Sequence, residues 1–189
     1  MKNYEEYKDL LKLRLTDKRY YHSLCVADEA KRLALKYGAD PEKAYLSGLL
    51  HDITKNAKKE EHFEIFKNFN ITLSEIELNA EKLWHAVSGA AYVKNILKIN
   101  DNDIIEAIRY HTTAKENMSL LDVILYLADF TSADRDYEDV DVIRKLTDES
   151  LESGLKYALS YSIKDLIDQS KAIHPDTVRA YNEVVMKGM

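Results

Sequence analysis

Four histidines and two aspartates are distributed along this chain in the way that metal ligands would be. They are His22, the adjacent pair His51 and Asp52, His85, His111 and Asp129. Imidazole nitrogens and carboxylate oxygens together form a mixed ligand set that suits iron, manganese, nickel, cobalt or zinc. A metal held in this way, with open coordination positions, converts water into a nucleophile near neutral pH. The first hypothesis is therefore a metal-dependent hydrolase.

The adjacent pair constrains how such a site could be built. Consecutive helix positions differ by about 100°, so His51 and Asp52 cannot point in the same direction. They could reach one metal from two sides, or Asp52 could bridge two metals. His22 and Asp129 would complete the first site, and the remaining two histidines of the set could hold a second metal or grip a phosphate of the substrate.

A single histidine is more often a packed or surface residue than a ligand, so each needs an alternative explanation. His62 lies among charged residues and is expected at the surface, whereas His174 precedes a proline and could cap or brace the last helix. The case for a metal rests on joint occurrence. Asp52 and Asp129 lie near apolar stretches, where an unpaired charge would be costly. A metal could be their partner, and so could a lysine or an arginine.

The hydrophobic periodicity is helical almost throughout, and the ends of the first helices can be read from their sequence. A helix is expected from about residue 17 to Gly38, since glycine is favoured after a helix C-terminus. Asp40 followed by Pro41 predicts the start of the next helix. Its apolar residues recur with helical spacing up to Ile53. The pair at 51–52 would lie beside this buried stripe and could face a cleft.

Later helices are also marked by caps. Two pairs of residues have the spacing of a capping box: Ser74 with Glu77, and Ser119 with Asp122. These boxes are expected to open the helices that carry His85 and Asp129. A further helical region is expected from about Val140 toward Ala172, with a break near Gly154.

Composition bounds the fold class and the cellular context. The 189 residues include only five glycines and two prolines and show no convincing strand, so one compact all-α domain over residues 1–189, with a metal site in a cleft between helices, is expected. A net charge of −6 argues against general nucleic-acid binding. Apolar stretches are too short for a membrane span. A single cysteine and no signal-peptide pattern favour a cytoplasmic protein, and an exposed apolar helix face could support a homodimer.

Five stretches of sequence make the chain similar to a known family. They are RYYHS at residues 19–23, HDITK at 51–55, RYHTT at 109–113, LADF at 127–130 followed by Arg135, and IHPDTVRAYN at 173–182. The order of histidines and aspartates resembles the HD-domain superfamily of metal-dependent phosphohydrolases. Taken together, the stretches resemble the YqeK-type symmetrical diadenosine tetraphosphate hydrolases. The loop after Asp129 departs from the family pattern, because it reads FTSADRD and lacks the proline of the usual Glu-Pro-containing stretch.

The resemblance implies an all-helical HD fold that binds one or two iron ions, with manganese, cobalt, nickel, zinc or magnesium as alternatives. It implies cleavage of diadenosine tetraphosphate into two ADP, by attack of a metal-activated water on a β-phosphorus. The metal ligands that it implies are His22, His51, Asp52 and Asp129. Asp52 would also act in catalysis, together with His85 and His111, which match positions at a second metal or on the phosphates.

Substrate contacts also follow from the resemblance. Lys55 and Arg135 match positions that would contact phosphates, and His174 and Thr177 would lie along the nucleotide. Arg19 lies three residues before His22 on the same helical face and is a further candidate, but a surface ion pair explains it equally well.

Other functions fit the same ligands. An HD phosphohydrolase could instead act on deoxynucleoside triphosphates, nucleoside monophosphates or guanosine alarmones. A nucleotide-sensing module would bind a nucleotide without cutting it, and a helical interaction domain would hold no metal.

Overall fold

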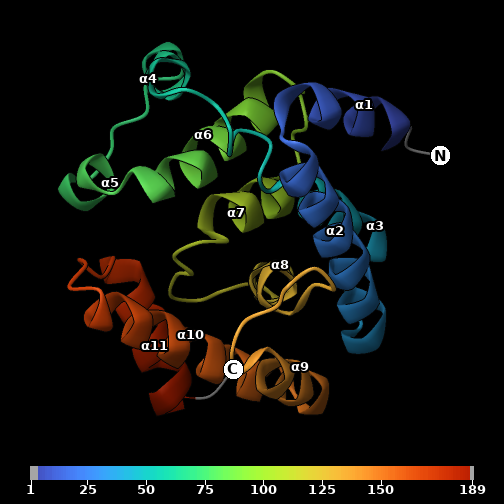
Figure 1. Cartoon of the computed structure of the whole chain (residues 1–189), viewed down its shortest axis with the longest axis vertical. Helices are drawn as coiled ribbons and strands as arrows, with labels where there is room; N and C mark the ends of the chain where they lie inside the picture. The colour runs from blue at the N-terminus through green and yellow to red at the C-terminus, as the bar shows by residue number, and fades with distance from the viewer. Residues whose placement is uncertain (1–3, 188–189) are drawn as a thin grey trace.

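Helices account for all of the regular structure in residues 4–187, the part of the chain that this computed structural model describes (Figure 1). The eleven helices are α1 Tyr4–Arg14, α2 Asp17–Tyr37, α3 Pro41–Leu50, α4 Lys59–Asn68, α5 Glu75–Asn79, α6 Glu81–Asn95, α7 Asn102–Tyr110, α8 Leu120–Thr131, α9 Val140–Glu149, α10 Leu151–Asp168 and α11 Pro175–Lys187. The expected all-α class is confirmed. No helix in this range has the length and apolar character of a membrane span.

Side-chain caps fix the helices that carry the candidate ligands. The Thr16 side chain accepts a hydrogen bond from the backbone N–H of Arg19, and α2 ends at Gly38, whose φ of 79° suits glycine. Asp40 caps α3 by accepting from the N–H groups of Glu42 and Lys43. These ends agree with those expected from the sequence, so the helices of His22 and His51 begin where local chemistry places them.

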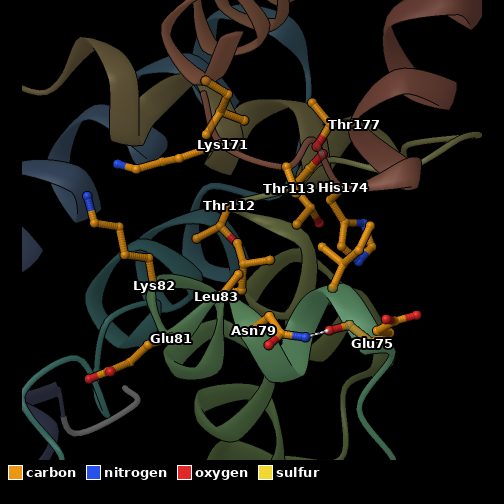
Figure 2. A pocket seen from close by; sticks show the side chains of 14 residues that line it. Glu75, Asn79, Glu81, Lys82, Leu83, Thr112, Thr113, Lys171, His174 and Thr177 are labelled. Atoms are coloured by element: carbon orange, nitrogen blue, oxygen red, sulfur yellow. Dashed lines mark hydrogen bonds between the residues drawn. The ribbon is translucent and has the colours of Figure 1, made fainter. Parts of the chain in front are cut away.

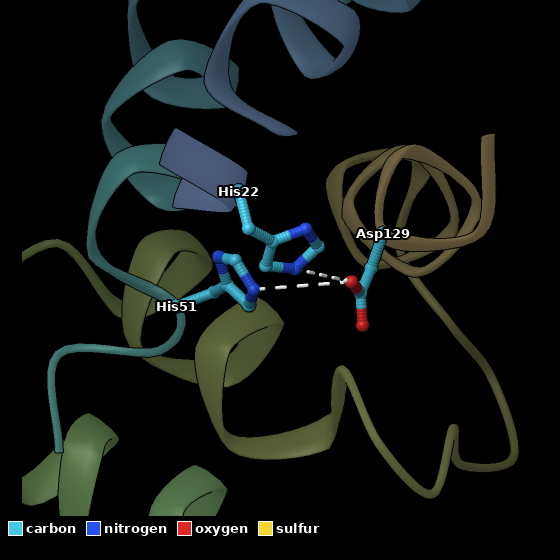
Figure 3. Close-up of side chains that lie close together, drawn as sticks. All are labelled: His22, His51 and Asp129. Carbon is cyan, nitrogen blue, oxygen red and sulfur yellow. Dashed lines mark ion pairs between the residues drawn. The ribbon is translucent and has the colours of Figure 1, made fainter. Parts of the chain in front are cut away.

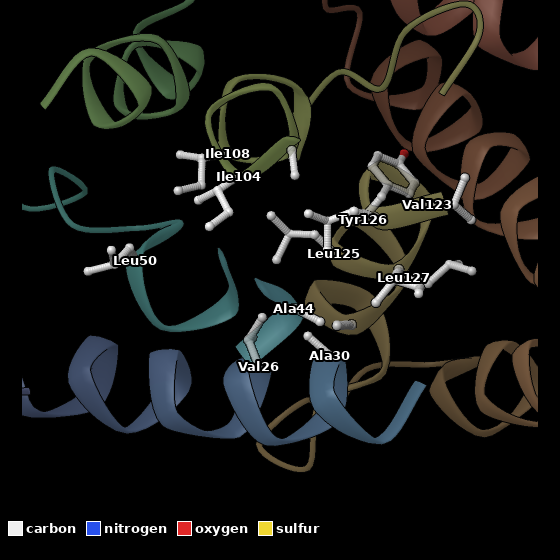
Figure 4. Packing of buried hydrophobic residues seen from close by; sticks show 14 of the residues in the cluster. Val26, Ala30, Ala44, Leu50, Ile104, Ile108, Val123, Leu125, Tyr126 and Leu127 are labelled. Carbon is white, nitrogen blue, oxygen red and sulfur yellow. The ribbon is translucent and has the colours of Figure 1, made fainter. Parts of the chain in front are cut away.

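The hydrophobic core is centred on α8, which is buried along most of its length (Figure 4). Leu125 and Leu127 of α8 are fully buried, as are Val26 of α2, Leu50 of α3 and Ile108 of α7. Helices α2, α3, α7, α9 and α10 all pack against α8. This arrangement brings the segments that carry His22, His51, His111 and Asp129 to one place, although they are far apart in sequence.

Two expected helix boundaries are wrong. The break expected near Gly154 lies at Ser150, whose backbone is extended and whose side chain caps α10 through the N–H of Ser153. Gly154 lies within α10 and packs against Thr147. The capping box of Ser74 and Glu77 opens the separate helix α5, and the helix that carries His85 begins only at Glu81.

His62 is buried, which corrects its expected place at the surface. Only 5% of the residue is exposed. Helix α4 packs against α6, and the Nδ1 atom of His62 lies 2.8 Å from the hydroxyl of Ser88. That hydroxyl is 2.8 Å from Thr54, which in turn donates to the backbone carbonyl of His85. His62 therefore belongs to a polar network beneath the turn that follows His51 and Asp52.

Candidate metal centre

The six candidate ligands come together in one place. His22 lies within α2, and His51 and Asp52 occupy the turn that follows α3. His85 lies within α6, His111 follows the last residue of α7, and Asp129 lies near the end of α8. The imidazole rings form a row in the order His22, His51, His111, His85. The distances between neighbouring ring centroids along this row are 5.3, 5.0 and 5.1 Å.

One end of the row can hold a cation between His22, His51 and Asp129 (Figure 3). The Nε2 atom of His22 lies 3.0 Å from Asp129 Oδ1, and that of His51 lies 3.9 Å from the same oxygen. One ligand atom from each residue falls within 4.8 Å of the others. Two imidazoles and a carboxylate at this spacing are a suitable set for a first-row divalent metal.

A second group contains His51, Asp52 and His111, again with ligand atoms within 4.8 Å of one another. His85 is not in that group but lies against it, because its Nε2 atom is 3.1 Å from His111 Nε2 and 3.1 Å from Asp52 Oδ1. The sequence analysis assigned His51 to the first site alone. In the structure it belongs to both groups.

Asp52 belongs to the second group and also approaches His22 of the first, and its two oxygens face different histidines. Oδ2 lies 3.4 Å from His51 Nε2 and 4.0 Å from His22 Nε2. Oδ1 lies 3.1 Å from His85 Nε2 and 3.7 Å from His111 Nε2. This is the arrangement that a carboxylate bridging two ions would need, one of the two roles considered for Asp52.

Three of the histidines are oriented by hydrogen bonds to their far nitrogen atoms. The Nδ1 atom of His22 lies 2.8 Å from Asp134 Oδ2. The Nδ1 atom of His51 lies 2.7 Å from the backbone carbonyl oxygen of Gly48, and that of His111 lies 2.7 Å from the backbone carbonyl oxygen of Ile108. An N–H at Nδ1 leaves Nε2 as the lone-pair nitrogen that faces the site, which is the usual way that proteins prepare a histidine ligand.

Several buried polar atoms at this centre have no hydrogen-bond partner. They are Nε2 of His22, Nε2 of His51 and Oδ1 of Asp52. Buried polar atoms are nearly always satisfied in proteins, and these three converge on the space between the rings. A divalent cation would satisfy them together, so the residues present fit a metal.

Burial and neighbouring charges determine the protonation of the acidic ligands. Burial alone would favour the neutral form of Asp52, but the adjacent imidazoles of His51, His111 and His85 hold its pKa well below its usual range. Burial also opposes ionisation of Asp129, but the Arg135 guanidinium and the adjacent imidazoles of His22 and His51 hold its pKa well below its usual range. Both carboxylates are therefore ready to act as anionic ligands.

His85, at the end of the row, is held neutral. Burial lowers the pKa of His85 to about 4, with a smaller lowering contribution from Lys55, against the opposing effect of Asp52. A neutral imidazole can accept a proton or bind a metal, whereas an imidazolium can do neither.

Three cationic side chains surround the centre. Arg19 donates to Asp52 Oδ2 at 2.9 Å, and Arg135 pairs with the Asp129 carboxylate while its Nε donates to the Asp129 carbonyl at 2.6 Å. Arginine partners, an alternative considered from the sequence, are thus present for both aspartates. The Lys55 amino group lies 3.0 Å from His85 Nε2, and burial lowers its pKa. Arg19, Lys55 and Arg135 together provide positive charge at the edge of the centre.

His174 and Thr177 lie apart from the ligands, in a mainly apolar cavity of about 520 Å³ that we call the apolar cavity (Figure 2). Other residues that line it include Ile76, Leu83, Thr112 and Leu166. His174 also braces α11, because its Nδ1 accepts from the N–H of Asp176 at 3.2 Å. The Thr177 hydroxyl donates to the carbonyl of Thr113 at 2.7 Å, which ties α11 to the segment after His111.

Sequence analysis did not identify Asp134, which contacts His22 across 112 positions of the chain. The one available signal was its place beside Arg135 in the loop FTSADRD, where an acidic residue accompanies the arginine. Burial of the carboxyl opposes ionisation, but His22 and the hydroxyl of Ser132 lower the pKa of Asp134. It is an anion that orients a candidate ligand.

Comparison with known proteins gives further observations. A family model described as "HD domain" matches residues 19–134. The chain is 35% identical over 178 residues to a protein of Halalkalibacterium halodurans named "Bis(5'-nucleosyl)-tetraphosphatase, symmetrical", covering 94% of this chain and 95% of that protein. A Bacillus subtilis protein of the same name is 35% identical over 183 residues, covering 97% and 98%.

A solved structure is also similar. It is a Clostridium acetobutylicum protein described as a predicted HD superfamily hydrolase involved in NAD metabolism. Its TM-score with this chain is 0.93 at 38% sequence identity, and the match covers 98% of each chain. The stretch matched by the family model, 19–134, contains all six candidate ligands and Asp134.

Proposed function

Because the chain belongs to the HD-domain family, a family of hydrolases, we propose that it hydrolyses dinucleoside tetraphosphates symmetrically, cutting diadenosine tetraphosphate into two ADP. Two relatives similar over nearly their whole lengths carry the name of this activity. The structural observation that carries the proposal is the convergence of unpaired Nε2 atoms from His22 and His51 and of Asp52 Oδ1 beside three cationic side chains.

Members of this family bind divalent metals, and His22, His51, Asp52 and Asp129 would hold the ion here. His111, with His85 beside it, would contribute to a second position that shares His51 and Asp52. We expect iron, or another divalent metal that accepts nitrogen and oxygen ligands. When bound, such a metal lowers the pKa of a coordinated water to about 7 and polarises a phosphoryl oxygen.

The chain's own residues would orient the substrate and stabilise charge. Phosphoryl transfer depends mainly on positioning and on fixed positive charge around the phosphoryl oxygens. Arg135 presents a planar guanidinium that can contact a phosphate through two N–H groups. Lys55 and Arg19 lie on the Asp52 side of the centre, so the three cations flank the place where the central phosphates would bind.

Neutral His85 is placed to exchange a proton with the reacting groups. Its Nε2 faces Asp52 and His111, and its pKa of about 4 leaves the ring unprotonated near neutral pH. A base must lie within hydrogen-bond reach of the proton that it takes. The position of His85 at the end of the row meets this condition for a water or a phosphate oxygen bound at the second group of ligands.

The apolar cavity would receive one nucleoside of the substrate. Its volume of about 520 Å³ is in the range of small-molecule sites. His174 and Thr177 line it on one side, and Figure 2 shows the amino groups of Lys82 and Lys171 together at one end. Those lysines were not identified from the sequence, and they would add positive charge for the phosphates that lead to the nucleoside.

The whole of residues 1–189 would act as one HD domain. Helices α9, α10 and α11 follow the stretch matched by the family model, yet α9 and α10 pack directly against α8, and α11 packs against α10. Because α10 supplies Leu166, α11 supplies Thr177 and the residue before α11 is His174, the apolar cavity and so the substrate site would be incomplete without these helices.

The test is to incubate metal-replete protein with diadenosine tetraphosphate and, separately, with nucleoside monophosphates, deoxynucleoside triphosphates and guanosine alarmones, and to resolve the products. Two ADP from diadenosine tetraphosphate, with little turnover of the other nucleotides, is the expected result. AMP with ATP, preference for another nucleotide, or binding without turnover would contradict the proposal. Asp52→Asn, prepared in parallel, should be inactive and excludes a contaminating enzyme.

A further inference from the structure

A second cavity lies directly beside the metal centre. It measures about 370 Å³ and reaches Asp129. Its most distinctive lining residues are aromatic or polar: Phe130, Arg135, Tyr137, Tyr161, Ser162 and Asp165. We call it the tyrosine cavity. The proposed function places one nucleoside in the apolar cavity and leaves this one without a role.

The tyrosine cavity and the apolar cavity meet. Leu83, Thr112 and Leu166 line both of them. Thr112 follows the candidate ligand His111, and its hydroxyl is a buried polar atom without a hydrogen-bond partner. An unsatisfied hydroxyl at the junction of two cavities indicates that a bound polar group completes the site there.

The aromatic side chains provide a stacking surface. The rings of Tyr137 and Tyr161 have centroids 5.4 Å apart, and that of Phe130 lies 6.5 Å from Tyr161. Tyr137 is fixed because its hydroxyl donates to the Phe130 carbonyl at 2.9 Å. A base stacked on such rings gains affinity whatever its identity, since every base has a π-face.

Polar groups also line the tyrosine cavity. Arg135 lies where the cavity meets Asp129 and carries the charge that a phosphate group would contact. Ser162 and Asp165 also line the cavity. The Asp165 carboxylate can only accept hydrogen bonds when ionised, so it suits the amino group of a purine. Arg135 therefore suits a phosphate group, the aromatic rings suit the face of a base, and Asp165 suits the polar edge of that base.

From these observations we infer that the tyrosine cavity binds the second nucleoside of the dinucleoside substrate, with its base stacked on Tyr161. The inference rests on the proposed function, because a symmetrical substrate carries one nucleoside on each side of the bond that is cut. The tyrosine cavity beside the metal centre and the apolar cavity that adjoins it would accommodate both. The two halves of a symmetrical substrate would then be bound by different side chains, because the tyrosine cavity is lined by Phe130, Tyr137 and Tyr161 and the apolar cavity is lined by no phenylalanine, tyrosine or tryptophan.

The binding test uses ADP as the probe and metal-loaded protein, with the number of ADP molecules bound per chain measured by calorimetry. The wild type should bind two ADP and Tyr161→Ala should bind one. Tyr161→Phe, which keeps the ring, should bind two. Tyr157→Ala is the matched control, because Tyr157 lies one helical turn earlier in α10 and does not line the tyrosine cavity. One ADP in the wild type, or two in Tyr161→Ala, would overturn the inference.

A kinetic test separates this inference from the proposed function. Tyr161→Ala should raise the KM for diadenosine tetraphosphate by roughly 5- to 150-fold, the value of one stacked base, with a smaller change in kcat. Tyr161→Phe should restore the KM. An unchanged KM in Tyr161→Ala beside an active wild type refutes the tyrosine cavity alone. If the wild type does not cut this substrate, the proposed function fails, and ADP stoichiometry still decides whether the cavity binds a nucleotide.

Discussion

Asp134 Oδ2 and His22 Nδ1 are 2.8 Å apart, which joins the loop after α8 to the second turn of α2. Asp134 also accepts from the hydroxyl of Ser132 at 2.8 Å, so its carboxylate is fixed on its own side. With Nδ1 occupied in this way, the ring directs Nε2 toward Asp129. The loop therefore contributes to the metal centre without providing a ligand.

Replacement of this carboxylate should weaken the metal site. We expect Asp134→Asn to lower metal affinity by about 10- to 100-fold, as is typical when the hydrogen-bond partner of a histidine ligand is lost. Metal titration with a fluorescent competitor would measure the change. Asp136→Asn is the control, because Asp136 is exposed in the same loop. Equal affinities in the two variants would show that Asp134 does not orient His22.

Metal removal should destabilise the wild type measurably. A ligand that binds only the native state, at 1,000 times its Kd, contributes about 4 kcal/mol. For a chain of this size that corresponds to a fall in Tm of roughly 8–16 °C after treatment with a chelator. Asp52→Asn should contain little metal by elemental analysis and should show little change in Tm. Asp28→Asn, an exposed change in α2, should show the same metal content and the same fall in Tm as the wild type. A full complement of metal in Asp52→Asn would show that Asp52 is not needed to bind the metal.

Lys55 should act on the reaction more than on folding. Its amino group lies 3.0 Å from His85 Nε2 and 3.8 Å from Asp52 Oδ1. Loss of one preorganised group that stabilises transition-state charge costs about 100- to 1,000-fold in kcat. We expect a fall of this size for Lys55→Gln in steady-state hydrolysis of diadenosine tetraphosphate. Lys58→Gln, an exposed change three residues later, should leave kcat within about twofold.

The positions of helices and ligands could be predicted to the extent that local sequence determines them. Asp40 and Ser119 cap their helices through their own side chains, and both were predicted as helix starts. Helix α4 was not expected, and its N-cap residue Lys58 makes no side-chain cap. A helix without such a signal depends on packing against α6, which local sequence does not reveal.

Tertiary contacts account for the remaining differences. The charged neighbours of His62 indicated a surface position, but its burial depends on Ser88 and Trp84 of α6. The contact of Asp134 with His22 could not be predicted, because it forms only where the fold places the loop after α8 against α2. The individual candidate ligands could be predicted because each lies beside an apolar stripe. The role of Asp52 could not, since its distances to the histidines depend on the relative positions of four helices.

Burial of His62 should make stability depend on pH. Burial lowers its pKa below the ordinary value near 6.5, so the unfolded chain binds a proton more readily than the folded chain. Above the unfolded pKa, His62 is neutral in both states and does not oppose folding. As the pH falls below the unfolded pKa, the free energy of unfolding decreases, and this loss continues until the pH is below the pKa of His62 in the folded chain. Urea unfolding of chelator-treated protein at pH 7.5 and 5.5 should show a larger loss for the wild type than for His62→Gln. The same loss in both proteins would contradict this account.

Gly48 should be essential to the spacing of the first two ligands. An added Cβ at this position would lie 2.7 Å from the Cα of Ala27 and 2.8 Å from the carbonyl oxygen of Val26, so only glycine allows α2 and α3 to approach this closely. His22 lies one turn before that crossing, and His51 lies one turn after Gly48. Separation of the two helices would therefore move both imidazoles apart.

Gly48→Ala should lower both stability and metal affinity, because the new methyl group meets backbone atoms that cannot move aside. Overpacking of this kind costs about 1–3 kcal/mol, measurable by urea unfolding. Gly89→Ala is the control, since the nearest atom to its new Cβ would be the Thr54 hydroxyl at 3.4 Å. That change should be neutral or gain up to about 1 kcal/mol of helix propensity. If Gly48→Ala binds metal as tightly as Gly89→Ala, the helix crossing does not set the spacing of His22 and His51.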